Sequence, residues 1–276
     1  MGRLDGKVAF VTGGARGQGR SHAVRLAEEG ADIITVDICD QIDTVHFDMA
    51  TPEDLAETVE SVGALDRRIV SEICDVRDRA ALEQVVARGV AELGRLDIAV
   101  ANAGISGAHT LADAADEEWA NVVDVNLTGV WNTLKAAVPA ILAGGRGGSV
   151  IVTGSYAASH GLPNLAPYTA AKHGVLGLMR SLASELGPHY VRVNAISPGN
   201  VGTKMLLNEE IYRVFRPDLE TPCFADVEEM FRSFPVIPVP YVEPIDISNA
   251  VVFLASDEAR YITGVELPVG AGWGLA

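Results

Sequence analysis

The chain contains few cysteines, few aromatic residues and few basic residues. Its 276 residues include 3 cysteines, 6% aromatic residues, and 21 Lys and Arg against 37 Asp and Glu. Cys39, Cys74 and Cys223 are far apart and form no C-x-x-C pair, so neither a disulfide framework nor a zinc knuckle is supported. The six histidines show no metal-ligand spacing. We therefore expect no metal site.

The shortage of basic residues gives a formal charge of −16 and a pI near 4.7. Such a field repels polyanions, so we expect no nucleic-acid partner and no anionic membrane surface, and acidic acyl carriers are disfavoured. Long apolar runs are also missing, since none approaches eighteen residues, and the first residues enter a strand without the apolar core of a signal peptide. These absences predict a soluble cytoplasmic protein.

Hydrophobic residues make up 48% of the chain and occur as short apolar runs that alternate with helical stretches. Strands are predicted at 7–13, 31–38, 67–76, 95–104, 148–155, 190–199 and 264–270, and helices near 19–30, 79–94, 116–142, 168–187 and 246–259. Strands that are apolar on both faces and followed by helices are typical of a parallel sheet covered on both sides. The pattern predicts an α/β fold, a Rossmann-like doubly wound parallel sheet, with a single domain over residues 1–276.

Two segments are too long to be simple connections between a strand and a helix. Residues 39–60 form an acidic insert, and residues 200–243 carry the large apolar side chains Met205, Leu206, Leu207, Phe215, Phe224, Met230, Phe231 and Phe234. Long loops at the carboxyl ends of parallel strands usually bind ligands. We expect 200–243 to be a substrate lid; the alternative is that its aromatic residues only pack beneath a long loop.

Residues 12–19, TGGARGQG, stand between the first strand and the first helix and predict a phosphate cradle. Gly14 to Ser21 nearly match the nucleotide-hydrolase pattern G-x-x-x-x-G-K-[ST], with Arg20 in place of the lysine. Gly13, Gly17 and Gly19 instead match T-G-x-x-x-G-x-G, a dinucleotide-binding spacing. Arginine is a poor substitute for a lysine that bridges phosphates as a compact charge, which favours the dinucleotide.

Asp37 ends the second strand and indicates which dinucleotide is bound. A carboxylate there accepts hydrogen bonds from the ribose hydroxyls of adenosine and repels a 2′-phosphate, which favours NAD over NADP. Arg16 acts in the opposite sense, because it could reach a 2′-phosphate. We expect Asp37 to dominate, since Arg16 can turn toward solvent. The alternative for Asp37 is a solvated strand end.

Ser155, Tyr168 and Lys172 form the chemical constellation of the chain. Tyr168 and Lys172 are four residues apart, so they share one helix face, and Ser155 ends the preceding strand. Oxidation of an alcohol needs a base for the hydroxyl proton. Free tyrosine titrates near pH 10, and a nearby ammonium favours tyrosinate. A serine hydroxyl can hold the substrate oxygen.

From Lys7 to about Gly272 the chain resembles the short-chain dehydrogenase/reductase superfamily. The resemblance rests on residues 12–19, Asp75 with Val76, residues 102–104, Asn126, the Ser155-Tyr168-Lys172 set and residues 198–203. Within the superfamily, the chain resembles the carveol-dehydrogenase-like subfamily in three features: the sequence GARGQGRSHA, the V-D-I-C strand end and the insert after it. That subfamily is associated with the redox cofactor mycofactocin.

The resemblance assigns roles by position. It implies that Asn126 places a water that relays protons from Lys172, with a backbone-bonded helix residue as the alternative. Asp75 matches an adenine contact, and Val201 with Thr203 matches the residues that hold the nicotinamide carboxamide. The full set of expected cofactor contacts is Gly13, Arg16, Gly17, Gln18, Gly19, Asp37, Asp75, Val76, Asn102, Ala103, Gly104, Tyr168, Lys172, Pro198, Gly199, Val201 and Thr203.

The resemblance implies an NAD-dependent oxidoreductase that acts on a small hydrophobic secondary alcohol or ketone, such as a carveol-like terpenoid. It further implies a homotetramer, with NAD held through turnover and mycofactocin as an external electron acceptor. Alternatives are an NADPH-dependent ketoacyl reductase and a non-catalytic NAD-binding regulator. Gln18 departs from the pattern, since the superfamily usually has an aliphatic residue there.

Overall fold

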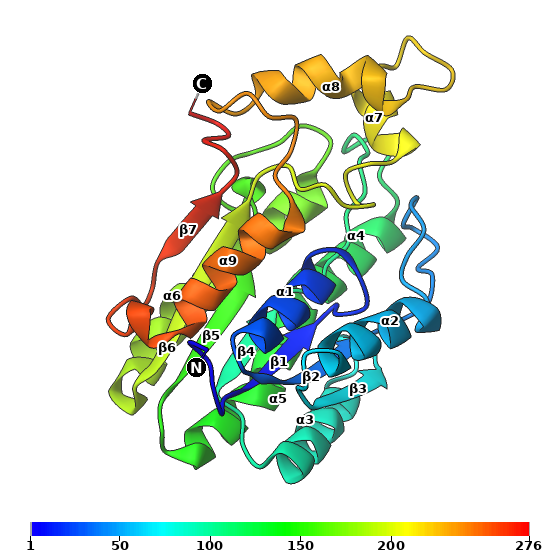
Figure 1. Ribbon diagram of the computed structural model, residues 1–276. Coiled ribbons are helices and arrows are strands. Elements are labelled where there is room, and N and C mark those ends of the chain that lie inside the picture. Colours follow the sequence, from blue (N-terminus) through cyan, green and yellow to red (C-terminus); the bar gives the residue numbers. More distant parts are fainter. Residues whose placement is uncertain (1, 276) are drawn as a thin grey trace.

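The computed structural model describes residues 2–275 and has one seven-stranded parallel sheet at its centre (Figure 1). The strand order is β3-β2-β1-β4-β5-β6-β7. The strands are β1 (Val8–Thr12), β2 (Asp32–Asp37), β3 (Ile69–Ile73), β4 (Ile98–Ala101), β5 (Gly148–Thr153), β6 (Val191–Pro198) and β7 (Glu266–Val269). The order reverses between β1 and β4, and crevices for ligands open at such a point. The predicted fold class is confirmed.

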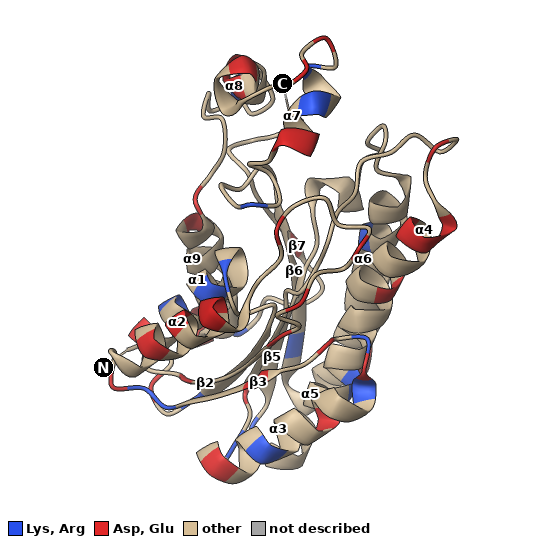
Figure 2. Cartoon of the chain, turned by 90° about the vertical axis from the view of Figure 1, so that its right-hand side faces the viewer, with Lys and Arg blue, Asp and Glu red and all other residues tan. Residues whose placement is uncertain are grey.

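Helices cover both faces of the sheet (Figure 2). One face carries α1 (Gly17–Glu28), α2 (Pro52–Gly63) and α9 (Pro244–Ala255), and the other carries α3 (Arg79–Leu93), α4 (Asp116–Val123), α5 (Gly129–Gly144) and α6 (Ala166–Leu186). The short helices α7 (Glu209–Phe215) and α8 (Phe224–Ser233) lie beyond the carboxyl ends of the strands. Within residues 2–275, no helix has the length and apolar character needed to cross a membrane.

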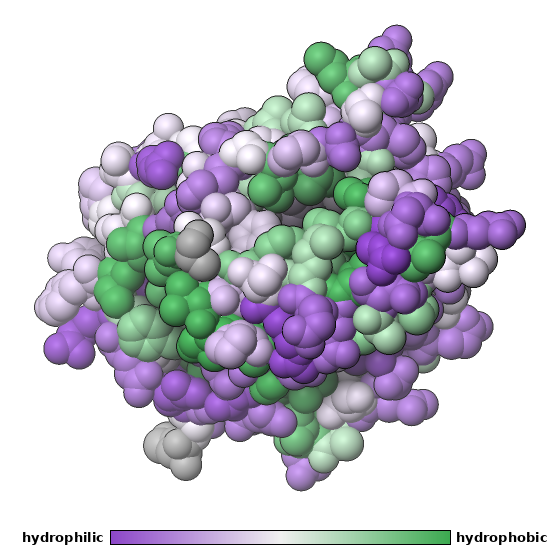
Figure 3. Space-filling view, turned by 90° about the horizontal axis from the view of Figure 1, so that it is seen from above, coloured by the Kyte–Doolittle hydropathy of each residue, from purple (hydrophilic) through white to green (hydrophobic). Residues whose placement is uncertain are grey.

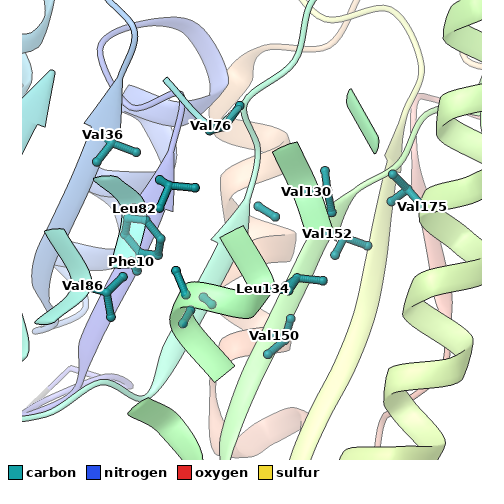
Figure 4. Packing of buried hydrophobic residues seen from close by; sticks show 14 of the residues in the cluster. Phe10, Val36, Val76, Leu82, Val86, Val130, Leu134, Val150, Val152 and Val175 are labelled. Carbon is teal, nitrogen blue, oxygen red and sulfur yellow. The ribbon is translucent and has the colours of Figure 1, made fainter. Parts of the chain in front are cut away.

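The core follows from strands whose residues are buried on both faces. All five residues of β1 are buried. Phe10 packs with Val36 and Leu82 on the face of α3 and α5 (Figure 4). Ala9 and Val11 pack on the opposite face, that of α1 and α9. Alternating side chains point to opposite faces of a strand, so a strand that is apolar throughout requires a helical layer on each side.

The segment 39–60 is only partly an insert. Residues 38–51 form an irregular loop, and α2 begins directly after them, where the Thr51 side chain accepts a hydrogen bond from the backbone N–H of Asp54. Helix α2 is the crossover between β2 and β3. The sequence carries signals of this helix that were missed: Pro52 at the first helical position, a capping box of Thr51 with Asp54, and one face formed by Leu55, Thr58 and Val62.

The segment 200–243 contains α7 and α8, which the sequence does not predict. Tyr212, Val227 and Phe231 are buried together, with Phe215, Phe224 and Phe234 packed around them. The aromatic residues of this segment therefore pack into a small core of their own, and the substrate lid stays a prediction. Met205 and Leu206 line a cavity at the carboxyl ends of the strands, and Leu206 also packs against this small core.

The long helix predicted over 116–142 is interrupted by a π-helical turn, Asp124–Thr128, between α4 and α5. A π turn adds one residue to the helical repeat and is often found at functional sites. Asn126 lies within this turn and is fully buried.

Candidate functional site

Two adjoining cavities open at the carboxyl ends of the strands. The larger has a volume of about 380 Å³ and contains Asp37 and the glycine-rich loop, and the smaller has a volume of about 190 Å³ and contains Tyr168. The residues on the wall that the two cavities share are Gln18, Asn102, Gly104, Thr203 and Met205. Seen from above, this end of the molecule is hollowed and bordered by hydrophobic residues (Figure 3).

The glycine-rich loop passes close to neighbouring backbone before it enters α1. Gly13 has φ +69°, a conformation that favours glycine. A Cβ at Gly19 would collide with the carbonyl oxygen of Gly13. The amino end of α1, which begins at Gly17, lines the larger cavity. Helix amino ends attract phosphate through their N–H groups and dipole, so this geometry fits a diphosphate.

Asp37 lies at the end of β2 on the wall of the larger cavity. It is buried, and its carboxylate accepts hydrogen bonds from the backbone N–H of Ala15 at 3.0 Å and of Cys39 at 3.4 Å. Burial raises the pKa of Asp37, while these backbone hydrogen bonds oppose the rise. The carboxylate is fixed in place, which makes the solvated strand end a poor description of it.

The two arginines near the loop are bonded to other segments of the chain, although Arg16 still lines the larger cavity. Arg16 donates to the backbone carbonyl of Asp48 and is partly buried, so it does not turn to solvent as expected. Arg20 pairs with Glu57 of α2 at 2.7 Å and donates to the carbonyl of Ala15 at 2.9 Å. Arg20 thus stabilises the packing of α1 on α2 and is not placed like the lysine of a nucleotide hydrolase.

The loop 38–51 forms an apolar cover on the larger cavity, with Ile38, Ile42, Phe47, Met49 and Ala50 on its inner side. The Gln41 side chain holds the loop together, because it donates to the carbonyl of Val45 at 2.8 Å and accepts from the N–H of Met49 at 3.1 Å. The side-chain amide of Asn121 in α4 donates a hydrogen bond to the Thr44 hydroxyl of this loop at 3.1 Å. Sequence analysis missed these residues, since only the length of the segment marked it.

Asn102 joins the strands at the reversal point. Its N–H donates to the Thr12 hydroxyl at 3.1 Å, and its side chain donates to the Thr12 carbonyl at 3.0 Å. This holds the ends of β4 and β1 together beneath both cavities. Ala103 and Gly104 follow on the same wall.

Asp75 and Val76 also line the larger cavity. The Asp75 carboxylate accepts from the Arg77 side chain at 2.8 Å and from the Arg77 N–H at 2.8 Å. The carboxylate is therefore held at the edge of the cavity by its own turn.

Ser155, Tyr168 and Lys172 meet in the smaller cavity. The Lys172 ammonium donates to the carbonyl of Thr153 at 2.7 Å and lies 5.6 Å from the centre of the Tyr168 ring. Burial lowers the pKa of Lys172 to about 8. Burial raises the pKa of Tyr168, and a hydrogen bond with Ser155 opposes this rise.

The expected lowering of the Tyr168 pKa by Lys172 is absent in the polypeptide on its own. The ammonium is bonded to the Thr153 carbonyl, and the cost of burying a tyrosinate exceeds the stabilisation that the chain supplies. The chain by itself therefore leaves the pKa of Tyr168 above its ordinary value.

Asn126 is the one predicted catalytic residue that lines neither cavity. Its side chain accepts from the N–H of Ile105 at 2.8 Å and donates to the carbonyl of Ile105 at 2.7 Å. It nevertheless lies near the lysine, because Asn126 Oδ1 and Lys172 Nζ are both within 4 Å of the position of a Cβ at Gly104.

The remaining wall of the smaller cavity is mostly apolar. Its large side chains are Tyr156, Leu162, Leu165, Met205, Leu206, Ile211 and Trp273, and Pro198, Gly199, Val201 and Thr203 also line it. Trp273 packs edge-on against Tyr156 with ring centres 4.1 Å apart. No local pattern predicted Trp273, which reaches the cavity from the far end of the chain. Within residues 2–275, no cluster of His, Cys, Asp or Glu could hold a metal ion.

Comparisons with known proteins agree with this geometry. Residues 13–274 match the family described as enoyl-(acyl carrier protein) reductase. A short-chain type dehydrogenase/reductase of Mycolicibacterium smegmatis is 57% identical over 273 residues, 98% of each chain. The (-)-trans-carveol dehydrogenase of Rhodococcus erythropolis is 50% identical over 273 residues, 99% of each chain. A carveol dehydrogenase from Mycobacterium avium, solved in complex with NAD, is 56% identical, with a TM-score of 0.98 over 100% of both chains.

The chain belongs to the short-chain dehydrogenase/reductase family and is an oxidoreductase. Within that family it is similar over its full length to two carveol dehydrogenases.

Proposed function

We propose that this protein is an NAD-dependent dehydrogenase that interconverts a small hydrophobic secondary alcohol and its ketone, with Tyr168 as the general base. The observation that carries the proposal is the meeting of Ser155, Tyr168 and Lys172 in an apolar cavity that adjoins the glycine-rich cleft. The carveol dehydrogenase relatives support a carveol-like terpenoid alcohol as the substrate.

The larger cavity would hold the adenosine and diphosphate of NAD, with the nicotinamide end toward the smaller cavity. The collision that a Cβ at Gly19 would cause shows how closely the loop is built around the amino end of α1, where the diphosphate would bind. Asp37 would accept hydrogen bonds from the adenosine ribose. An isolated charge pair at about 4 Å is worth about 4 kcal/mol at an effective dielectric of 20, so the same carboxylate would reject the 2′-phosphate of NADP.

The chain's own residues would handle the proton. The Ser155 hydroxyl would hold the substrate oxygen, and the phenolate of Tyr168 would take the hydroxyl proton. Lys172 would favour the phenolate, and its position near Asn126 supports a proton path through a water to solvent. Bound NAD would supply the hydride acceptor and the additional positive charge.

The Gln41-braced loop 38–51 would hold NAD through turnover, with mycofactocin as an external electron acceptor. The exposed Trp119 and Trp131 on the outer side of α4 and α5 support a homotetramer. Free Cys39, Cys74 and Cys223 support a cytoplasmic location.

The NADPH-dependent ketoacyl reductase is the competing function, because the matching family is described as an acyl-carrier reductase. Asp37 and the formal charge of −16 disfavour NADPH and an acidic carrier. A non-catalytic NAD-binding regulator would have no need of the assembled Ser155, Tyr168 and Lys172.

The first test is chemical. Small molecules released from the purified protein should include NAD by mass. A screen of secondary alcohols with an artificial electron acceptor should then yield activity on cyclic apolar substrates. Release of NADP, or activity confined to ketoacyl thioesters with NADPH, would favour the competing function.

The second test is Tyr168→Phe. Loss of the base should lower kcat at least about 100-fold while NAD binding is retained. Tyr261→Phe is the matched control, because Tyr261 is 89% exposed and should keep full activity. A Tyr168→Phe enzyme with more than about a tenth of the activity would remove Tyr168 as the base.

A further inference from the structure

Gln18 carries a buried, unpaired acceptor at the wall between the two cavities. It is the second residue of α1 and lies on the wall that the two cavities share. Its Oε1 is buried and has no hydrogen-bond partner among residues 2–275. A buried carbonyl without a partner costs about 1–3 kcal/mol, so such an atom in a native protein requires an explanation.

The position of Gln18 between the cavities indicates which part of a ligand it meets. This step rests on the proposed function. The diphosphate would bind at the amino end of α1, and the reacting ring must lie near Tyr168 in the smaller cavity. A dinucleotide that spans both cavities therefore passes Gln18 with its nicotinamide end.

The charges around the smaller cavity indicate which redox state of the nicotinamide this contact would favour. Of the described residues that line it, none is Asp or Glu, and Lys172 is the one cation. Oxidised nicotinamide is positively charged, whereas reduced nicotinamide is neutral. Lys172 would thus repel the oxidised ring, and the negative end of the Gln18 amide dipole would offset that repulsion where it meets the ring.

We propose that Gln18 is a positioning residue that holds the oxidised cofactor in preference to the reduced one, through its unpaired carbonyl oxygen. Selective stabilisation of NAD⁺ makes bound NADH a stronger hydride donor, because the two affinities and the redox equilibrium form one thermodynamic cycle. The contact would assist transfer of the hydride to a ketone or to an external acceptor.

The test compares the two dissociation constants in nucleotide-stripped protein. NADH binding is followed by its fluorescence and NAD⁺ binding by competition with NADH. Gln18→Leu keeps the size of the side chain and removes the dipole. It should weaken NAD⁺ binding about three- to tenfold, the effect of one modest hydrogen bond, and change NADH binding less than twofold. Gln84→Leu is the matched control, because Gln84 is an exposed residue of α3, and it should change neither dissociation constant.

Two results would overturn the inference. Equal weakening of both nucleotides would show that Gln18 only packs against the cofactor, and stronger weakening of NADH would show that the amide N–H faces the ring. If Gln18→Leu does not fold, Gln18→Asn withdraws the same carbonyl by one methylene and should shift the ratio in the same direction. Failure of the parent protein to bind either nucleotide would refute the proposed function itself, a result separate from an unchanged ratio.

Discussion

Lys172 should make the stability of this protein rise with pH. The side chain is 3% exposed, its hydrogen bond is to the neutral carbonyl of Thr153, and burial lowers its pKa from 10.5 to about 8. The charged form is thus disfavoured in the folded state. At 1.36 kcal/mol per pKa unit, burying the charged Lys172 lowers the free energy of unfolding at neutral pH by about 3 kcal/mol relative to a protein with an uncharged side chain at this position.

The direction follows from proton linkage. Because the folded pKa is below the unfolded one, the unfolded chain binds more protons between about pH 8 and 10.5, and stability rises through that window. The free energy of unfolding of the parent should therefore gain about 2 kcal/mol over that of Lys172→Met between pH 7 and 9.5. The lost hydrogen bond to Thr153 and altered packing shift the variant's curve by an amount that does not depend on pH.

Urea unfolding of nucleotide-stripped protein at fixed concentration measures the difference. Lys135→Met is the control, because Lys135 is exposed on α5 and its curve should stay parallel to that of the parent. Parallel curves for the parent and Lys172→Met would refute the reasoning, since they would show that the lysine is solvated or paired in the folded state.

Three further changes test other parts of the structure. Asp37→Asn should bind NADP at least about tenfold more tightly, as measured by the ratio of the NAD and NADP dissociation constants, and an unchanged ratio would place the discrimination elsewhere. Gln41→Ala removes the bonds that hold loop 38–51 and should speed NAD dissociation in stopped-flow, whereas Gln84→Ala should not; equal rates in all three proteins would show that the loop retains nothing. Phe231→Ala, in the small core of α7 and α8, should lower the free energy of unfolding by about 3–5 kcal/mol in urea, and a loss below about 1 kcal/mol would mean that this core is not tightly packed.

The sheet and the catalytic set could be predicted because their signals are local. Apolar runs such as residues 148–153 have one stable arrangement, a strand with helices on both faces. Tyr168 and Lys172 lie on one helix, so their spacing alone brings them together. The glycine-rich loop and Asp37 are fixed by the order of β1, α1 and β2.

The parts that could not be predicted depend on contacts between distant segments. Trp273 reaches the smaller cavity from the carboxyl end of the chain, and its position depends on packing against Tyr156 and Phe234. The Arg16 contact with Asp48 requires loop 38–51 to fold back over the cavity. Periodicity carries no information about such pairs.

The pKa of Tyr168 shows the same limit. The sequence identifies Lys172 as a neighbour with the right charge, but the balance between that charge and burial depends on distance and hydrogen bonding. In the structure the Lys172 ammonium donates to the Thr153 carbonyl. Burial then raises the pKa of Tyr168.

The π turn at residues 124–128 sets the angular phase between the two halves of a long helix. One additional residue turns α4 by about 100° relative to the phase that an uninterrupted α-helix would give it. That rotation presents Glu118 to His109 at 2.7 Å and Asn121 to Thr44 at 3.1 Å, and so holds both loops that border the larger cavity. A deletion of one residue within the turn would leave the composition of α4 and α5 intact and still face these side chains away from their partners. A change of length at this turn should therefore be harmful even where every contact residue is kept.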